Sequence, residues 1–63
     1  MKVDSFKAIF KNKENLLNKG IKMYVQTKNN VIEVTQDTSC MDDVVYFKNY
    51  TIPVKDIYHF IMY

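Results

Sequence analysis

The hydrophobic pattern of this chain changes within the stretch Leu16-Leu-Asn-Lys-Gly-Ile-Lys-Met-Tyr-Val-Gln-Thr27. Before Gly20 the apolar residues recur at helical spacing, and after it Ile21, Met23 and Val25 alternate with polar residues. A period of about 3.6 residues is typical of an amphipathic helix, whereas a period of about 2 is typical of a half-buried strand. Gly20 also stands where a helix C-cap glycine is expected. The stretch therefore predicts a helix that ends at Gly20 and a strand that begins directly after it.

Towards the N-terminus, the same pattern predicts a single helix over about residues 4–19. Asp4 or Ser5 can serve as its N-cap. Lys13 interrupts the apolar side of this helix, and we expect its aliphatic stem to lie along the core edge while the ammonium extends into water. The apolar positions fall within one arc of roughly 120°, and they are Phe6, Ile9, Phe10, Leu16 and Leu17.

Towards the C-terminus, four to five short strands are predicted. A hairpin turn is expected at residues 28–30, because asparagine tolerates the left-handed conformation. Pro53 indicates an edge or a bend in the strand that contains it. A polar, acidic loop is expected over residues 37–43, and the predicted strands cover residues 21–27, 31–36, 44–48 and 51–54.

The last segment, residues 56–63, can be read in two ways. It can continue as a strand, or it can form a short helix with Ile57, Phe60 and Ile61 on one side. Its β-branched and aromatic content favours the strand. The order of elements predicts an α+β fold in which an N-terminal helix precedes a small antiparallel meander of four to five strands over about residues 21–63.

The length of 63 residues leaves room for one domain, residues 1–63. A domain of this size buries only about 60% of its unfolded surface, so it needs good packing, a metal, a disulfide or a partner chain. One cysteine, Cys40, cannot form an internal disulfide, and Cys40 with His59 supplies only two of the four ligands of a structural zinc site. We therefore expect no cofactor or metal, and a contribution from self-association.

The chain also lacks signals for export or membrane insertion. No apolar run approaches the roughly 18 residues of a membrane-spanning helix. The first residues carry lysines between single hydrophobic residues, unlike a signal peptide. A single cysteine fits a reducing compartment. A cytoplasmic location without a membrane partner is therefore predicted.

The charges are distributed unevenly along the chain. Residues 1–30 carry seven lysines and two acidic residues, a net charge of +5, whereas residues 31–63 carry two lysines and five acidic residues, a net charge of −3. Such asymmetry can mark a polyanion-binding surface, or it can steer a partner of opposite charge. The candidate basic surface consists of Lys7, Lys11, Lys19 and Lys22, and the candidate acidic patch consists of Asp37, Asp42 and Asp43.

All nine basic residues are lysine, and arginine is absent. Arginine is the residue preferred for bidentate contacts with phosphates and bases, so its absence argues mildly against sequence-specific DNA recognition. Frequent lysine, asparagine, isoleucine and tyrosine also suggest an AT-rich genome, bacterial or phage.

Catalytic chemistry finds little support among these residues. A cysteine nucleophile needs a lowered thiol pKa, an orienting partner and a substrate pocket, and a chain this short rarely encloses such a pocket. The stretch from Asp37 to Asp42 lacks the ligand spacing and the glycine of a calcium-binding loop. We therefore predict a protein that is not an enzyme.

The C-terminal stretch Ile57-Tyr-His-Phe-Ile-Met-Tyr63 is dense in aromatic residues. As a strand it presents largely apolar side chains on both faces, which one small sheet and one helix cannot easily cover. Tyrosine and phenylalanine are enriched in the cores of protein interfaces. The predicted self-association residues are Tyr58, Phe60, Ile61, Met62 and Tyr63.

The order of elements resembles that of the bacterial Sm-like proteins. The resemblance rests on the alternating stretches from Ile21 to Lys48 and on Ile52-Pro-Val-Lys-Asp-Ile57, with residues 58–62 as closing strand. It implies a short N-terminal helix, a bent five-stranded antiparallel sheet, rings formed by pairing of edge strands, and RNA binding. Asn29-Asn30 replaces the family's Asn-Gly turn, and Asp56 follows Lys55 where the family has histidine, so no RNA-binding residue is carried over.

Together these features predict a small, non-catalytic regulatory or inhibitor protein of the kind encoded by phages and mobile elements. It would bind a host protein and form a homodimer or higher oligomer. The alternative is an Sm-like or other nucleic-acid-binding protein that uses its lysine-rich helix face to bind RNA.

Overall fold

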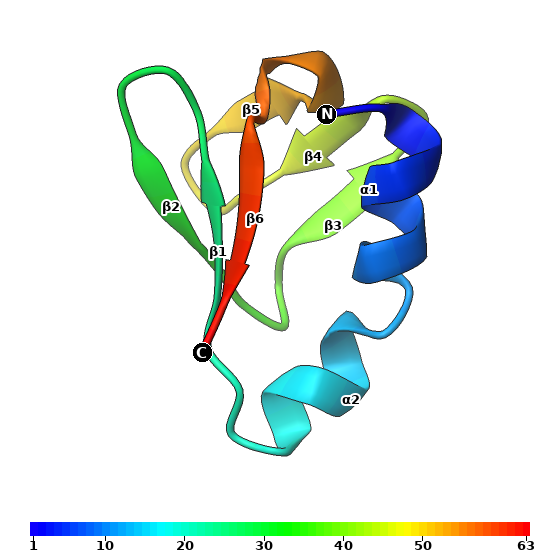
Figure 1. The fold of residues 1–63 in the computed structure, drawn as a ribbon, viewed down its shortest axis with the longest axis vertical. Helices are drawn as coiled ribbons and strands as arrows, with labels where there is room; N and C mark the ends of the chain where they lie inside the picture. Colours follow the sequence, from blue (N-terminus) through cyan, green and yellow to red (C-terminus); the bar gives the residue numbers. More distant parts are fainter.

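The structure of the chain, a computed structural model, describes all 63 residues. Two helices precede antiparallel strands, which confirms the α+β class (Figure 1). The elements are α1 (Val3–Phe10), α2 (Lys13–Asn18), β1 (Met23–Gln26), β2 (Val31–Val34), β3 (Ser39–Met41), β4 (Val44–Tyr46), β5 (Thr51–Pro53), the 3-10 helix η1 (Val54–Asp56) and β6 (His59–Met62).

The single helix expected over residues 4–19 is divided into α1 and α2, so that prediction is wrong in its middle. Asn12 lies between the two helices with φ −98° and ψ 9°, outside the helical region. Its N–H donates to the carbonyl of Ile9 at 3.2 Å, a bond that tightens the last turn of α1. Asparagine is a weak helix former, and the break allows Lys13 to reach the loop between β2 and β3.

The start of α1 also differs from expectation. The helix begins at Val3, with Lys2 in the N-cap position and no side-chain cap, so neither Asp4 nor Ser5 caps it. Asp4 instead lies in the first turn, where its negative charge interacts favourably with the helix dipole.

The end of α2 agrees with the sequence prediction. Gly20 has φ +86°, its N–H donates to the carbonyl of Leu17 at 3.0 Å, and the N–H of Ile21 donates to the carbonyl of Leu16 at 3.1 Å. These two bonds form a Schellman motif, which requires a left-handed residue that glycine adopts without a steric penalty.

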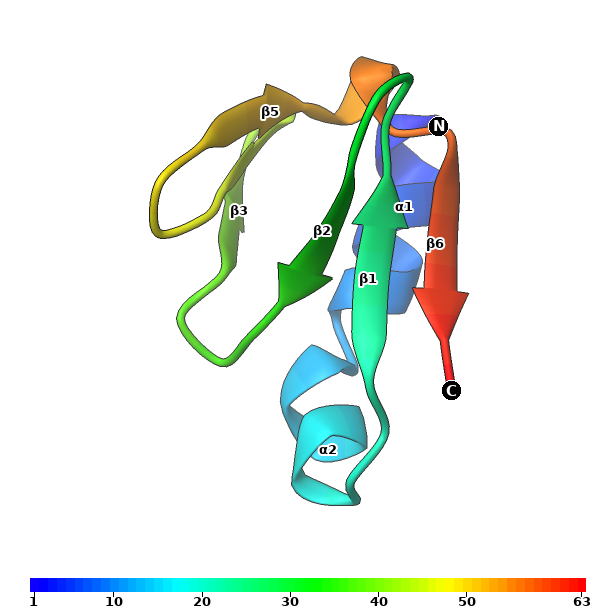
Figure 2. The same cartoon turned by 90° about the vertical axis from the view of Figure 1, so that its left-hand side faces the viewer.

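The strands form two three-stranded antiparallel sheets that share no strand (Figure 2). In the first sheet β1 lies between β2 and β6, and in the second sheet β4 lies between β3 and β5. There are thus six strands rather than four to five, and β6 returns to pair with β1. The C-terminal segment forms a strand, as its composition favoured.

β3 lies within the loop expected over residues 37–43. Cys40, in the middle of this strand, pairs with Val45 and is half-buried. The two-residue turn that follows contains Asp42 in the left-handed region, with φ 57°. A strand of three residues in a polar, acidic setting has too little periodicity to be recognised from sequence.

The hairpin turn between β1 and β2 lies where it was expected, but for a different reason. Asp42 is the only non-glycine residue with a positive φ, so neither asparagine of this turn is left-handed. The turn is closed by Thr27, whose N–H donates to the carbonyl of Asn30 at 2.8 Å and whose hydroxyl oxygen accepts from the N–H of Asn30 at 3.2 Å.

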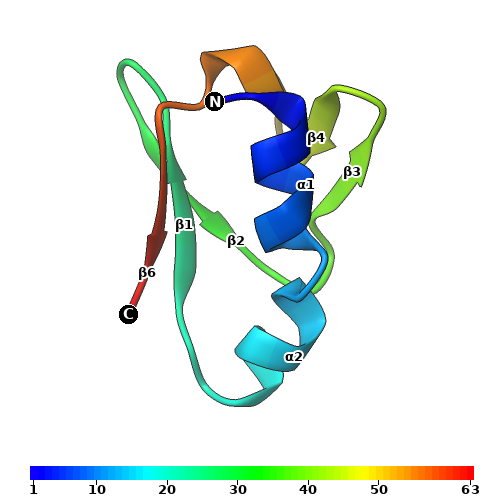
Figure 3. The same ribbon diagram turned by 45° about the vertical axis from the view of Figure 1, so that its right-hand side comes forward.

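The core lies between the two sheets and the helices (Figure 3). Phe6 of α1 is fully buried, and its ring stacks on Phe10 at 5.2 Å between centroids and contacts Phe60 of β6 at 5.5 Å. The buried apolar residues are Phe6, Met23, Val25, Val34, Val45, Val54 and Ile57. Full burial of one such side chain contributes about 1.5–3 kcal/mol.

Candidate binding surfaces

The outer edge of β6 is an open edge of the first sheet. β1 is the only strand that pairs with β6. The N–H of Tyr63 donates to the carbonyl of Lys22 at 3.0 Å, which places the backbone groups of every second residue on the β1 side. By this alternation Phe60 and Met62 direct their N–H and C=O groups away from β1, to the open edge.

The predicted self-association residues divide into two groups. Tyr58, Met62 and Tyr63 are 56%, 47% and 77% exposed. Phe60 and Ile61 are half-buried, and the Phe60 ring packs on Phe6 in the core. Phe60 therefore offers its backbone rather than its ring to a partner at this edge.

The face of the first sheet that points away from the core carries aromatic side chains. Tyr24 of β1 pairs with Ile61 of β6. The Tyr24 ring meets the ring of Tyr63 edge-on, with centroids 5.7 Å apart. Val31 of β2 is 58% exposed. This face and the β6 edge form one continuous, partly apolar surface.

The four lysines of the predicted basic surface are all exposed, but they do not lie on one helix. Lys7 belongs to α1 and Lys11 follows its last residue, whereas Lys19 follows the last residue of α2 and Lys22 precedes β1. The break at Asn12 thus separates Lys7 and Lys11 from Lys19, three lysines that the single predicted helix would have carried on one side.

The acidic patch is divided in a similar way. Asp37 lies in the loop after β2, and the other two members, Asp42 and Asp43, form the turn between β3 and β4. All three are exposed. No three His, Cys, Asp or Glu side chains come close enough together to hold a metal ion.

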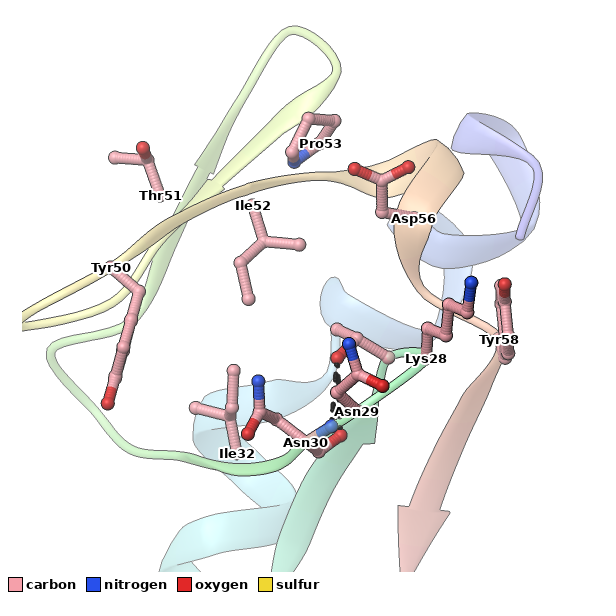
Figure 4. A pocket seen from close by; sticks show the side chains of 11 residues that line it. Lys28, Asn29, Asn30, Ile32, Tyr50, Thr51, Ile52, Pro53, Asp56 and Tyr58 are labelled. Atoms are coloured by element: carbon pink, nitrogen blue, oxygen red, sulfur yellow. Dashed lines mark hydrogen bonds between the residues drawn. The ribbon is translucent and has the colours of Figure 1, made fainter.

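Sequence reasoning missed a cleft of about 440 Å³ between the β1–β2 turn and β5 (Figure 4). Ile32 and Ile52 point into it from opposite sides, Tyr50 stands at one end, and Tyr58 stands near Lys28 at the other. The lining residues are Thr27, Lys28, Asn29, Asn30, Ile32, Tyr50, Thr51, Ile52, Pro53, Asp56 and Tyr58. No sequence signal indicates the cleft, because only the tertiary structure brings the turn and β5 together.

A second depression of about 200 Å³ extends the cleft along β2. Ile32 and Tyr50 line both spaces, so the two are neighbours. The further lining residues are Glu33, Thr35, Thr38, Phe47, Lys48 and Asn49. We call these two neighbouring spaces, which lie between β2 and the β4–β5 hairpin, the groove.

The Lys13 ammonium is held inside the protein rather than extending into water, so that expectation is wrong. Lys13 is only 8% exposed. Its Nζ donates to the carbonyls of Thr35 at 3.0 Å, Gln36 at 2.9 Å and Thr38 at 2.6 Å. Burial lowers the pKa of Lys13, while the negative charges of Glu14 and Asp37 partly oppose this shift. The arrangement uses all three N–H donors of the ammonium for structure.

The cysteine and the histidine lie in different sheets. Cys40 belongs to β3 and His59 to β6. Burial raises the pKa of the Cys40 thiol, Asp42 and Asp43 raise it further, and Lys7 acts in the opposite direction. The neutral thiol that results is a weak nucleophile.

No protein-family model, curated protein or solved structure matches this chain. Neither α1 nor α2 has the length and apolar character needed to cross a lipid bilayer.

Proposed function

We propose that this chain is a non-catalytic interaction protein that forms a homodimer through β6 and binds a host protein in the cytoplasm, in the manner of small phage or mobile-element regulators. The observation that carries the proposal is the open edge of β6, where exposed Met62 and Tyr63 flank unpaired backbone groups. An open apolar edge strand is a template for pairing with another chain.

The alternation of backbone groups specifies the register of such a dimer. Only Phe60 and Met62 direct their N–H and C=O groups outward, so an antiparallel pair related by a two-fold axis places Phe60 opposite Met62 of the second copy. Ile61 then lies opposite Ile61 of the second copy, at the two-fold axis. The two first sheets would join into one six-stranded sheet.

The small core supports the same proposal. Only 9 of the 63 residues are buried, which makes a domain of this size marginal without a partner.

The experiment replaces Met62 with proline, which removes one outward N–H without touching the bonds to β1. Sedimentation equilibrium of the native chain at micromolar concentration should show a dimer, and Met62→Pro should be monomeric. Met62→Ala keeps the N–H and serves as the matched control, which should remain dimeric. A native chain that sediments as a monomer over the same range contradicts the dimer.

A second candidate function is binding of single-stranded RNA. Lys22 and Tyr63 are joined by a backbone hydrogen bond, so an exposed cation lies beside the Tyr24–Tyr63 aromatic pair. Aromatic stacking combined with lysine contacts is how proteins bind single strands without sequence preference. Affinity for single-stranded RNA should then fall steeply with salt and be reduced in Lys22→Glu, which reverses the charge beside the Tyr24–Tyr63 pair. No binding at low salt would exclude this candidate.

A further inference from the structure

The groove between β2 and β5 is bordered by two open strand edges. β2 is the outer strand of the first sheet and β5 is the outer strand of the second. The two sheets therefore face the same groove with unpaired edges, and the Ile32 and Ile52 side chains point into it from opposite sides (Figure 4).

The ladder geometry tells which backbone groups of β2 are free. The N–H of Thr27 donates to the carbonyl of Asn30, so every second residue after Asn30 directs its groups to β1. Val31 and Glu33 are the residues in between, and their N–H and C=O groups point away from β1. These four groups are spaced as an extended chain requires.

The backbone groups of β5 alternate in the same way. The N–H of Phe47 donates to the carbonyl of Tyr50, and the N–H of Val54 donates to the carbonyl of Asp43. Ile52 therefore bonds to β4, and Thr51 and Pro53 turn outward. Because proline has no N–H, this edge offers fewer donors than β2.

The charges along the groove distinguish between classes of ligand. Lys28 and Asp56 line the larger space, and Glu33 and Lys48 line its extension. The groove thus carries two cations and two anions, with no excess positive charge to attract phosphates. The free backbone groups and the two isoleucine side chains fit an extended polypeptide better than a nucleic acid.

We propose that this groove binds an extended polypeptide segment of a partner protein, which adds as a strand to the open edge of β2. Its side chains would contact Ile32 and Ile52, Tyr58 would lie at one end, and Tyr50 would lie between the two spaces. The proposal rests on the proposed function, because it specifies where and how a protein partner is bound. This mode obtains affinity from main-chain hydrogen bonds and specificity from alternate side chains.

The test starts by selecting displayed random peptides on the native protein and measuring the affinity of the enriched synthetic peptides. Glu33→Pro removes one outward N–H of β2, and Glu33→Ala keeps it, so the two form a matched pair. Loss of one backbone hydrogen bond should weaken peptide binding by about tenfold. The alanine variant should stay within about twofold of the native affinity.

Amide hydrogen exchange on the native protein provides a second readout that does not depend on folding of the proline variant. A bound peptide should protect the N–H groups of Val31 and Glu33. In a peptide that pairs with β2, every second N–H points to β2 and the others point away. Methylation of the nitrogens that point to β2 should weaken binding at least about tenfold, and methylation of the others should not.

Three outcomes would overturn the proposal. One is that no peptide is enriched, and another is that bound peptides protect amides elsewhere while Glu33→Pro binds them normally. The third is that oligouridine binds the groove and displaces the peptides. Sedimentation of the same samples separates this proposal from the dimer, because Glu33→Pro should remain dimeric and Met62→Pro should still bind peptide.

Discussion

The Lys13 ammonium connects the start of α2 to the loop between β2 and β3. Its three hydrogen bonds replace those that it would make with water, which offsets part of the desolvation that lowers its pKa. The ammonium also lies 5.3 Å from the centroid of the Phe10 ring, at a distance where a cation–π attraction operates.

Replacing Lys13 with methionine should destabilise the fold by about 2–3 kcal/mol, because it leaves the carbonyls of Gln36 and Thr38 without a donor and removes one of the two donors to Thr35. Urea unfolding followed by circular dichroism measures the change. Lys11→Met, at an exposed position, is the control and should change stability by less than about 0.5 kcal/mol. Equal effects of the two substitutions would show that the Lys13 bonds contribute no stability.

Cys40 should react slowly with thiol reagents. Burial and the two neighbouring aspartates raise its pKa, so the thiol stays protonated to a higher pH in the folded protein than in the unfolded chain. The stability that comes from the neutral thiol is present below the ordinary cysteine pKa and is lost as the pH rises through the raised value. The alkylation rate with iodoacetamide should be at least about tenfold lower than in urea at neutral pH.

The pH profile of that reaction provides the check. Its midpoint should lie at a higher pH in the native protein than in urea, as measured by mass spectrometry of the alkylated chain. A native midpoint at or below the unfolded one would contradict the raised pKa.

At the scale of elements, the loop between β2 and β3 is organised by Thr38. This residue is 3% exposed, and its hydroxyl oxygen accepts from the N–H of Thr35 at 3.0 Å. Its own N–H donates to the carbonyl of Thr35 at 3.1 Å, and its carbonyl accepts from Lys13. The loop therefore positions both the end of β2 and the start of β3.

Thr38→Val keeps the shape of the side chain but leaves the N–H of Thr35 without an acceptor. The free energy of unfolding should fall by about 1–2 kcal/mol. Thr38→Ser keeps the acceptor and loses one methyl group, so it should cost about 1 kcal/mol or less. A shift of the urea midpoint with unchanged slope measures the difference, and a serine variant as unstable as the valine variant would point to packing instead.

At the scale of the whole molecule, a core of few buried residues supports a sheet whose two outer strands, β6 and β2, both have open edges. If two copies pair through β6, thermal stability depends on protein concentration by mass action. A tenfold increase in concentration should raise the unfolding temperature by about 3–5 °C.

Calorimetry over a range of concentrations checks this expectation. The Met62→Pro variant should show an unfolding temperature that does not change with concentration. A concentration-independent temperature in the native chain would argue that the β6 edge remains unpaired.

The periodicity of the sequence predicted most of the secondary structure, because the spacing of apolar residues reflects which face of a helix or strand is buried. Met23 and Val25 alternate with Tyr24 and Gln26, and the structure buries the first pair. The break at Asn12 was not predictable in this way. It accompanies the contacts of Lys13 with three carbonyls 22 to 25 residues further along the chain, which no local pattern reveals.

The candidate surfaces show the same division. The C-terminal strand and its apolar residues follow from composition, but whether β6 has an open edge depends on which strand pairs with it. The sequence identified the charged residues of the basic surface and the acidic patch. The break between α1 and α2, and the presence of β3 between Asp37 and Asp42, determine which of these residues are neighbours. The groove left no local signal, since Ile32 and Ile52 read as ordinary strand residues.

The sequence by itself determined the α+β class, the glycine-capped end of the helical region at Gly20, and the alternation of β1, because these depend on local conformational preferences and on one buried face. Only the tertiary structure decided that β6 pairs with β1 and that Lys13 is enclosed. It also decided that two open edges border one groove. These features arise from contacts between distant segments, whose free energy depends on the whole packing arrangement and not on the neighbouring residues in the chain.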